Sequence, residues 1–233
     1  MSSPTILIVP GFWEGPAPFA QVSSLLQDYG FPTEIATLPS TGKSSPGNPS
    51  MHDDIAAIRS AVAKLVESGK EVVMLMHSGG GFLGSNAIEG LGITACGEAK
   101  GGVTKLVFVS AALFPEGYLH QPLPFFSFDG GMMHCKTPET LLFSDLDAAS
   151  AEDWTRKLRP QPAEGWDQTV TYAGWKDVSS VYLVCENDQV IPPQMQLQMA
   201  ELAGSKVEKC GAGHVPFLSM PEKVADVVRS AIA

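Results

Sequence analysis

The amino-acid sequence predicts an α/β fold in which helices cover both faces of a mostly parallel central sheet of about six strands. Short and almost uninterrupted apolar runs, such as TILIVP (5–10) and EVVMLM (71–76), are typical of strands buried on both faces. Segments with helical periodicity alternate with these runs, which indicates parallel pairing through crossover helices. Hydrophobic residues make up 44% of the 233 residues and charged residues 17%, so the chain can bury a sizeable core as a single domain over 1–233.

The first part of the chain contains the clearest expected helix. It comes after a helix expected over about 17–29 and a strand expected in TEIATLP (33–39). Ser50 and Asp53 stand at the spacing of a capping box, with Asp in place of the usual Glu or Gln, and Gly69 is expected to end the helix. Its apolar face consists of Ile55, Ile58, Val62, Leu65 and Val66.

The same alternation continues to the end of the chain. After the strand at 71–76, a helix is expected to begin at Ser78, and KLVFVS (105–110) is expected to form the next strand. The remaining elements are expected strands in SSVYLVC (179–185) and SKVEKC (205–210), with helices near 192–202 and 221–233.

The segment from about 113 to 176 has a different composition. Phe, Met, Pro and Trp cluster there without a strand repeat, and short helical pieces are separated by prolines. We expect this segment to be a helical cap inserted at the carboxyl edge of the sheet, where open α/β sheets keep their ligand sites.

Bulk properties exclude several function classes. The net charge of −10 and the pI of about 4.9 argue against a nucleic-acid or anionic-membrane surface, because such surfaces need clustered Lys and Arg. The four cysteines lack metal-ligand spacing, and we expect neither a metal nor a cofactor. The start MSSPTILIVPG (1–11) lacks the basic region of a signal peptide, and no apolar run approaches about 18 residues. We therefore expect a soluble cytoplasmic protein. A homodimer is compatible with the sequence, which does not fix the oligomeric state.

The glycines after the strand at 71–76 admit a first interpretation, as a dinucleotide site. Gly79, Gly81 and Gly84 match the pattern G-x-G-x-x-G. That pattern belongs after the first strand of its fold and needs an acidic residue at the tip of the next strand. Here it lies well inside the chain, and the next strand ends in FVSAALF (108–114) without a carboxylate, so we reject this interpretation.

The second interpretation makes Ser78 a nucleophile on a tight turn between strand and helix. The surrounding residues match the pattern G-x-S-x-G, except that Met76 replaces the leading glycine. Gly80 provides the small residue that the turn requires two positions after the serine. A methionine at position 76 must find room under the following helix.

A serine hydroxyl needs an imidazole to accept its proton and a carboxylate to orient that imidazole. In this arrangement the acid and then the histidine follow on loops after later strands. The stretch VYLVCENDQVIPP (181–193) offers Glu186 and Asp188, and Asp188 is preferred because it lies deeper in the loop and has the shorter side chain. His214 lies on a Gly-rich loop after the last strand. The predicted catalytic residues are therefore Ser78, Asp188 and His214.

An oxyanion hole needs backbone N–H groups directed at the developing negative charge. Gly79 can provide one at the positive end of the helix that follows Ser78. Phe12, on the loop after the first strand, is expected to provide the other.

The sequence resembles the α/β-hydrolase superfamily, in particular the branch that contains plant methylesterases, hydroxynitrile lyases and small bacterial and fungal esterases. The resemblance covers nearly the whole chain and implies the same triad and oxyanion donors. The segments that carry it are LIVPGFWEGPAPF (7–19), LMHSGGGFLG (75–84), LLFSDLDAASAEDW (141–154), VTYAGWKDVSSVYLVCENDQVIPPQMQ (170–196) and GAGHVPFLSMPEKVA (211–225).

Three departures from the family pattern bear on the reaction. The family often has His-Gly where this chain has Pro10-Gly11, and a second His-Gly where it has Glu14-Gly15. Hydroxynitrile lyases place a lysine directly after the catalytic histidine, and this chain has Val215 there. The resemblance therefore implies a serine hydrolase of esterase or thioesterase type and not a cyanohydrin lyase.

The expected partner is a small or medium hydrophobic carboxylic ester or thioester. Two alternatives remain at this stage: acyl transfer to a hydroxyl of the substrate itself, which closes a lactone, and a receptor that binds a hydrophobic molecule without turnover. The residues expected to bind substrate are Trp13, His77, Phe125, Met132, Met133, Phe143 and Trp154.

Overall fold

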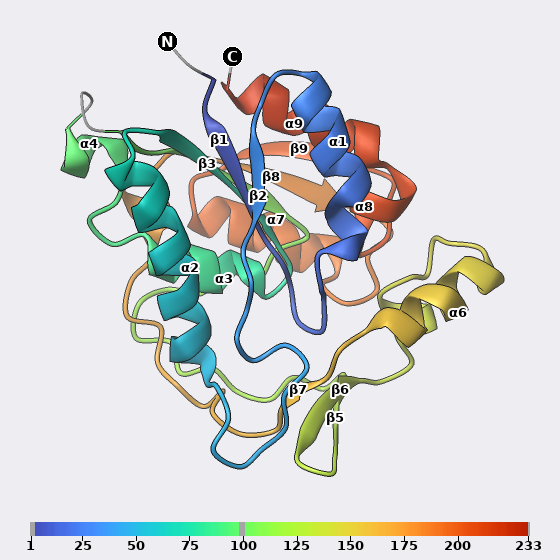
Figure 1. The fold of residues 1–233 in the computed structure, drawn as a ribbon. Helices are drawn as coiled ribbons and strands as arrows, with labels where there is room; N and C mark the ends of the chain where they lie inside the picture. The colour runs from blue at the N-terminus through green and yellow to red at the C-terminus, as the bar shows by residue number, and fades with distance from the viewer. Residues whose placement is uncertain (1–2, 98–100, 233) are drawn as a thin grey trace.

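The fold is built on a parallel sheet of six strands, as the sequence predicted. The computed structural model describes residues 3–97 and 101–232 (Figure 1). The strands lie in the order β2-β1-β3-β4-β8-β9, and every neighbouring pair is parallel. Their bounds are β1 Thr5–Val9, β2 Thr33–Ile35, β3 Glu71–His77, β4 Gly102–Val109, β8 Ser180–Cys185 and β9 Lys206–Cys210.

Helices cover both faces of this sheet. α1 (Ala20–Asp28) packs against α9 (Pro221–Ile232) on one side, and α2 (Met51–Glu67) packs against α3 (Gly80–Ala87) on the other (Figure 1). α7 (Pro193–Leu202) contacts β8 and β9. The short elements of the body are η1 Ala17–Phe19, α4 Ile93–Cys96 and α8 Pro216–Ser219.

The predicted cap of α2 is present. The Ser50 side chain accepts the Asp53 backbone N–H, and the Asp53 carboxylate accepts the Ser50 backbone N–H. These two reciprocal bonds satisfy amide groups that a helix start leaves without partners. Asp therefore replaces Glu or Gln in the capping box without loss of either bond.

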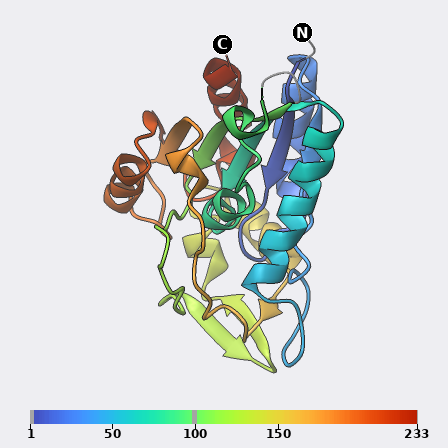
Figure 2. The same cartoon turned by 90° about the vertical axis from the view of Figure 1, so that its left-hand side faces the viewer.

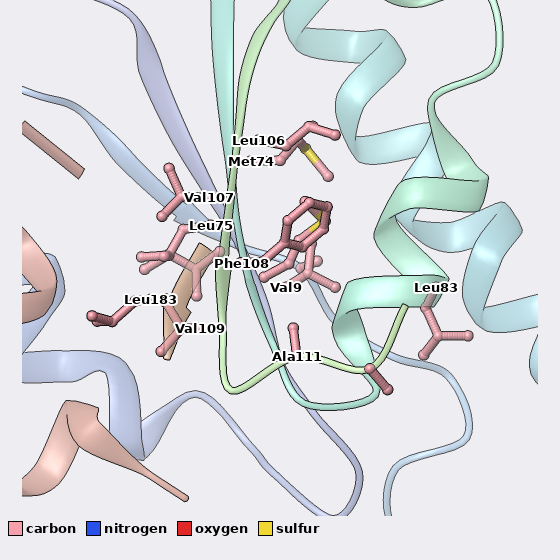
Figure 3. Packing of buried hydrophobic residues seen from close by; sticks show 14 of the residues in the cluster. Val9, Met74, Leu75, Leu83, Leu106, Val107, Phe108, Val109, Ala111 and Leu183 are labelled. Atoms are coloured by element: carbon pink, nitrogen blue, oxygen red, sulfur yellow. The ribbon is translucent and has the colours of Figure 1, made fainter. Parts of the chain in front are cut away.

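The core lies on both sides of the central strands, because successive side chains of a strand point to opposite faces. Figure 3 shows Leu75, Val107 and Leu183 on one side, with Met74 and Phe108 on the other, toward α3. All five side chains are buried. This two-sided burial explains the continuous apolar runs in the sequence.

Residues 110–179 form the insertion between β4 and β8. It contains the expected short helices, but it also contains an antiparallel sheet in the order β5-β6-β7, which was not predicted. Figure 2 shows this small sheet at the end of the molecule that lies opposite the chain termini. Its elements are β5 Phe126–Asp129, β6 Met132–Cys135, α5 Pro138–Leu141, α6 Ala148–Lys157, β7 Gln161–Pro162 and η3 Gly174–Lys176.

Within the described ranges, no helix combines the length and the apolar character needed to cross a bilayer.

Candidate active site

Ser78 lies on the turn between β3 and α3 with a backbone φ of 49°. Such a left-handed conformation is strained for a residue with a side chain, and it is maintained only where the surrounding structure fixes it. The Ser78 carbonyl accepts N–H groups from Gly81 and Ala112 at 3.0 and 2.9 Å, which fixes the turn. α3 begins at Gly80 and not at Ser78 as expected, because the turn occupies the first two positions.

Glycine is required directly after this turn. A Cβ atom at Gly80 would collide with the carbonyl oxygens of Val9 and Pro10 at the end of β1. The helix can therefore start close to β1, and the loop that follows β1 lies near Ser78.

The structure also explains how the turn accommodates Met76. This side chain is fully buried, and its sulfur lies 2.7 Å from the position that a Cβ atom at Gly84 would take. Gly84 thus leaves room under α3 for the methionine. The last glycine of the G-x-G-x-x-G pattern serves packing in this chain, since the space beside it is filled by Met76.

Ser78, His214 and Asp188 are brought together at the carboxyl edge of the sheet. Ser78 Oγ lies 2.9 Å from His214 Nε2, and His214 Nδ1 lies 2.9 Å from Asp188 Oδ2. Asp188 and His214 are both buried. Glu186, the other candidate acid, is exposed and lies 3.6 Å from Lys209 Nζ. The arrangement allows His214 to accept the serine proton while Asp188 holds the opposite ring nitrogen.

Gln196 on α7 positions Asp188 and was not predicted. Its Nε2 donates to Asp188 Oδ2 at 3.0 Å and to Ile191 O at 2.7 Å, and its Oε1 accepts the Cys185 N–H at 2.9 Å. The side chain is fully buried. A signal was present in the sequence: Gln196 lies four residues before Ala200, so both are on the buried face of this helix.

Two backbone N–H groups next to Ser78 remain without a protein acceptor in the described part of the chain. They belong to Phe12 and Gly79, the predicted oxyanion donors. The Phe12 ring lies 3.2 Å from the position that a Cβ atom at Gly79 would take, so the two residues are in close contact. Their free N–H groups are suited to hold an oxyanion formed at Ser78.

His77 does not line the cavity beside Ser78, although it was expected to contact substrate. Its Nδ1 lies 2.8 Å from Glu14 Oε2, and its Nε2 lies 2.8 Å from the carbonyl oxygen of His214. Burial is the largest influence on the pKa of His77 and lowers it. Glu14, the His214 carbonyl and Asp188 together outweigh burial and raise the pKa above its ordinary value.

The insertion supports two of the loops that form the site. Gln161 accepts the Trp13 backbone N–H at 3.0 Å, and the Trp13 indole donates to Met133 O at 2.9 Å. Asp145 accepts the Gly213 N–H at 2.6 Å, next to His214. The insertion therefore contributes to the geometry of the site as well as to its walls.

A cavity of about 160 Å³ opens beside Ser78. Apolar side chains dominate its wall, and the polar ones are Ser78, Tyr118 and His120. A larger hollow of about 520 Å³ lies at the amino ends of β8 and β9, away from Ser78. The residues that line the smaller cavity are Phe12, Ser78, Gly79, Phe82, Ala112, Phe114, Tyr118, His120, Leu123, Phe125, Val190, Ile191, Met195 and Met199.

Of the residues predicted to bind substrate, Phe125 lines this cavity. Trp13, Phe143 and Trp154 line a separate surface hollow between the insertion and the loop after β1. The Met133 side chain is buried, and neither it nor the Met132 side chain belongs to the wall of the cavity. These side chains pack the insertion against the body. Composition alone could not distinguish such packing residues from residues that line a pocket.

His120 lines the cavity and is buried, although it was not among the residues predicted to bind substrate. Its Nδ1 donates to Trp166 O at 3.0 Å, because a carbonyl oxygen can only accept, and burial lowers the pKa of His120. Its Nε2 has no hydrogen-bond partner within the described residues.

Metal ligands are not grouped in the described ranges: no three His, Cys, Asp or Glu side chains lie where they could hold one ion.

The model of the alpha/beta hydrolase family matches residues 6–227. The chain belongs to the alpha/beta hydrolase family. It is 30% identical to alpha/beta hydrolase nvfD of Aspergillus novofumigatus, over 99% of this chain and 97% of that protein. It is 31% identical to probable hydrolase R7 of a Phoma species, over 98% of both chains. This alpha/beta hydrolase is therefore a hydrolytic enzyme.

Solved structures share the fold of this hydrolase at low sequence identity. Polyneuridine aldehyde esterase superposes with a TM-score of 0.76 and 19% identity, over 98% of this chain and 99% of that one. Methylesterase MES16 from Arabidopsis superposes with a TM-score of 0.73 and 16% identity, over 98% of each chain. These similarities extend over the body and the insertion alike.

Proposed function

We propose that this hydrolase is a serine esterase that cleaves small or medium hydrophobic carboxylic esters or thioesters. The observation that carries the proposal is the continuous chain of two hydrogen bonds from Ser78, which lines an apolar cavity, through His214 to Asp188. Ser78 is the nucleophile, His214 the general base and acid, and Asp188 the group that orients His214.

In the first half of the reaction, Ser78 Oγ bonds to the carbonyl carbon and its proton passes to His214 Nε2. The carbonyl electron pair moves onto oxygen, where the N–H groups of Phe12 and Gly79 hold it. Collapse of this intermediate breaks the bond to the alkoxide or thiolate, which leaves with the proton from His214. Water then attacks the acyl-serine with His214 as base, and release of the acid returns the proton to Ser78.

The cavity supports a hydrophobic substrate of limited size. Its volume of about 160 Å³ is close to the ~150 Å³ that accommodates a benzene molecule in an apolar protein cavity. The cavity wall carries no Lys, Arg, Asp or Glu side chain among the described residues, so a charged acyl group would lose solvation without compensation. The names of esterases among the structural neighbours agree with a carboxylic ester.

The experiment that tests this proposal is covalent labelling with a fluorophosphonate, followed by intact mass and hydrolysis of p-nitrophenyl butyrate and benzoate. We expect one label on the wild-type protein and turnover of both esters, and neither with Ser78→Ala. Ser85→Ala is the matched control, because Ser85 is a buried serine of α3 whose hydroxyl has no partner within the described residues. It should label and turn over like the wild type.

Retention of turnover by Ser78→Ala would refute the assignment of the nucleophile. A wild-type protein that binds the esters but neither labels nor turns over would be a receptor and not an enzyme. Product masses from hydroxy-ester substrates separate hydrolysis, which adds the mass of water to the acyl group, from lactone formation, which does not.

A further inference from the structure

The ring of His77 has a hydrogen-bond acceptor at each nitrogen. Glu14 Oε2 lies 2.8 Å from Nδ1, and the backbone carbonyl of His214 lies 2.8 Å from Nε2. A carbonyl oxygen accepts and never donates, so Nε2 must carry a proton. The contact at Nδ1 requires one further proton, which either His77 or Glu14 carries.

The surroundings of Glu14 indicate that this further proton is on His77. The same oxygen, Glu14 Oε2, also accepts the Gly11 N–H at 2.7 Å. An oxygen that already accepts one N–H is better matched to a second N–H donor as a carboxylate than as a hydroxyl. Glu14 and His77 are also 7% and 1% exposed, so little water competes for either partner.

We propose that Glu14 and His77 form a buried ion pair that positions the catalytic base and the oxyanion loop relative to each other. Glu14 accepts the Gly11 N–H and thereby holds the loop on which the Phe12 N–H lies. His77 holds the backbone of His214, whose side chain is held separately by Asp188. The kinetic consequence rests on the esterase function proposed above, whereas the ion pair itself does not.

Few other groups face His77. Its ring centroid lies 4.9 Å from that of His214, and the aromatic rings of Phe19 and Phe217 cover it at 6.3 and 5.1 Å. The charged groups that act on it are Glu14 and Asp188. The negative charge of Glu14 offsets the positive charge of the His77 imidazolium, so His214 can become positively charged during the reaction without facing an unpaired cation.

A glutamine at position 14 cannot replace this arrangement. An amide oxygen at the place of Glu14 Oε2 could still accept from Gly11 and His77, but it would leave a buried imidazolium without a counter-charge. A neutral His77 can keep its bond to His214 O through Nε2–H and accept at Nδ1 from the amide N–H₂ of a glutamine at position 14, but an amide nitrogen there can no longer accept the Gly11 N–H, so the bond that holds the loop is lost. Glu14→Gln is therefore a nearly isosteric change that breaks the pair.

The protonation state of His77 can be measured directly. The chain contains five histidines, so ¹⁵N-histidine labelling gives a spectrum that substitution can assign. In the wild type at pH 8 we expect both His77 nitrogens to carry protons. In Glu14→Gln we expect a neutral ring. A wild-type His77 that is neutral at pH 8 would overturn the proposal, whatever the activity of the protein.

The positioning role is tested by kinetics on the ester that the wild type turns over. Glu14→Gln should lower kcat by about 10- to 100-fold, because misplaced groups react poorly, and should change KM by no more than about threefold. Glu14→Gln/His77→Gln should be no slower than the slower single variant, because the two residues act as one unit.

His52→Gln is the matched control, because His52 Nε2 also contacts a backbone carbonyl, that of Thr169, at 3.1 Å outside the site. Its kcat should equal that of the wild type. Additive losses in the double variant, or an unchanged kcat in Glu14→Gln with a neutral His77, would refute the positioning role. If instead His77 is an imidazolium but Ser78→Ala stays active, the esterase proposal fails and the ion pair stands.

Discussion

The two halves of the site are held by different kinds of interaction. The half contributed by the body contains buried side chains with directional bonds: Asp188 alone accepts from Val190 N, Ile191 N, Gln196 Nε2 and His214 Nδ1. The insertion meets the cavity mainly with partly buried apolar side chains, such as Leu123 and the stacked rings of Phe114 and Tyr118, whose centroids lie 4.1 Å apart. Its directional bonds, from Gln161 and Asp145, support loops of the body and not the cavity wall.

This difference indicates in which half of the site amino-acid substitutions are tolerated. A hydrogen bond fixes distance and angle, and loss of one partner leaves a buried polar group unsatisfied at a cost of about 1–3 kcal/mol. Apolar packing is non-directional and tolerates a change of shape at smaller cost. We therefore expect substitutions in the body half to reduce the reaction itself, and substitutions in the insertion half to change which ester reacts.

The largest effect is expected from Asp188→Asn. The amide oxygen can still accept from Val190 and Ile191, but the amide N–H₂ would face His214 Nδ1 and donate to it. His214 would then carry its proton on Nε2 and could not accept the one from Ser78, so kcat should fall by about 10⁴-fold. Glu186→Gln, a change of the exposed carboxylate two residues earlier, should leave kcat close to that of the wild type. Equal effects of the two variants would contradict the assignment of the acid.

A smaller but clear loss is expected from Gln196→Met, which keeps the volume and removes every hydrogen bond. Asp188 would lose one donor, and the Cys185 N–H would lose its acceptor. We expect kcat to fall by about 10- to 100-fold and the free energy of unfolding to fall by about 1–3 kcal/mol. Assays of ester hydrolysis measure kcat, and urea denaturation measures the free energy of unfolding. Gln198→Met, on the exposed side of the same helix, is the control, and a similar loss there would point to a general effect on α7.

The smallest effect on the reaction is expected in the insertion, from Phe125→Ala. The enlarged cavity should favour bulkier acyl groups, changing the ratio of kcat/KM for p-nitrophenyl benzoate over acetate by about 10-fold or more. Trp154→Ala removes another partly buried aromatic side chain of the insertion, but one that lies in the separate hollow. It should leave that ratio unchanged. A shift of the ratio by Trp154→Ala would mean that the two hollows join when substrate binds.

The sequence predicted the body in detail because its signals are local. Strand burial on both faces produces continuous apolar runs, and the cap at Ser50 is a pattern of four residues. The order of Ser78, Asp188 and His214 could also be predicted, since each follows a strand and parallel strands bring their carboxyl ends to one edge. Gln196 was not predicted, because its spacing from Ala200 places it on one face of the helix but does not reveal its partners. These are Cys185, Asp188 and Ile191, which lie in a strand and a loop whose fold must be known first.

The antiparallel sheet of the insertion and most of its cavity-lining residues could not be predicted, for a physical reason. Its antiparallel strands are short, and β6 carries two methionines, a histidine and a cysteine without clear alternation. Whether an apolar side chain such as Phe143 faces a cavity or the body depends on contacts with distant residues, which no local period encodes. Composition therefore identified a segment that contributes to the wall, but among the residues predicted to bind substrate Phe125 is the one that lines the cavity.

His214 follows β9, one of the two edge strands of the sheet. Within the sheet, β9 hydrogen-bonds to β8 alone, and most of its residues are exposed or partly exposed. Edge elements of this kind open locally at a lower free energy than the whole molecule unfolds. At low concentrations of denaturant, ester turnover should consequently disappear before the helical circular-dichroism signal does. The enzyme would then lose its activity through local opening of one edge strand while its core stays folded.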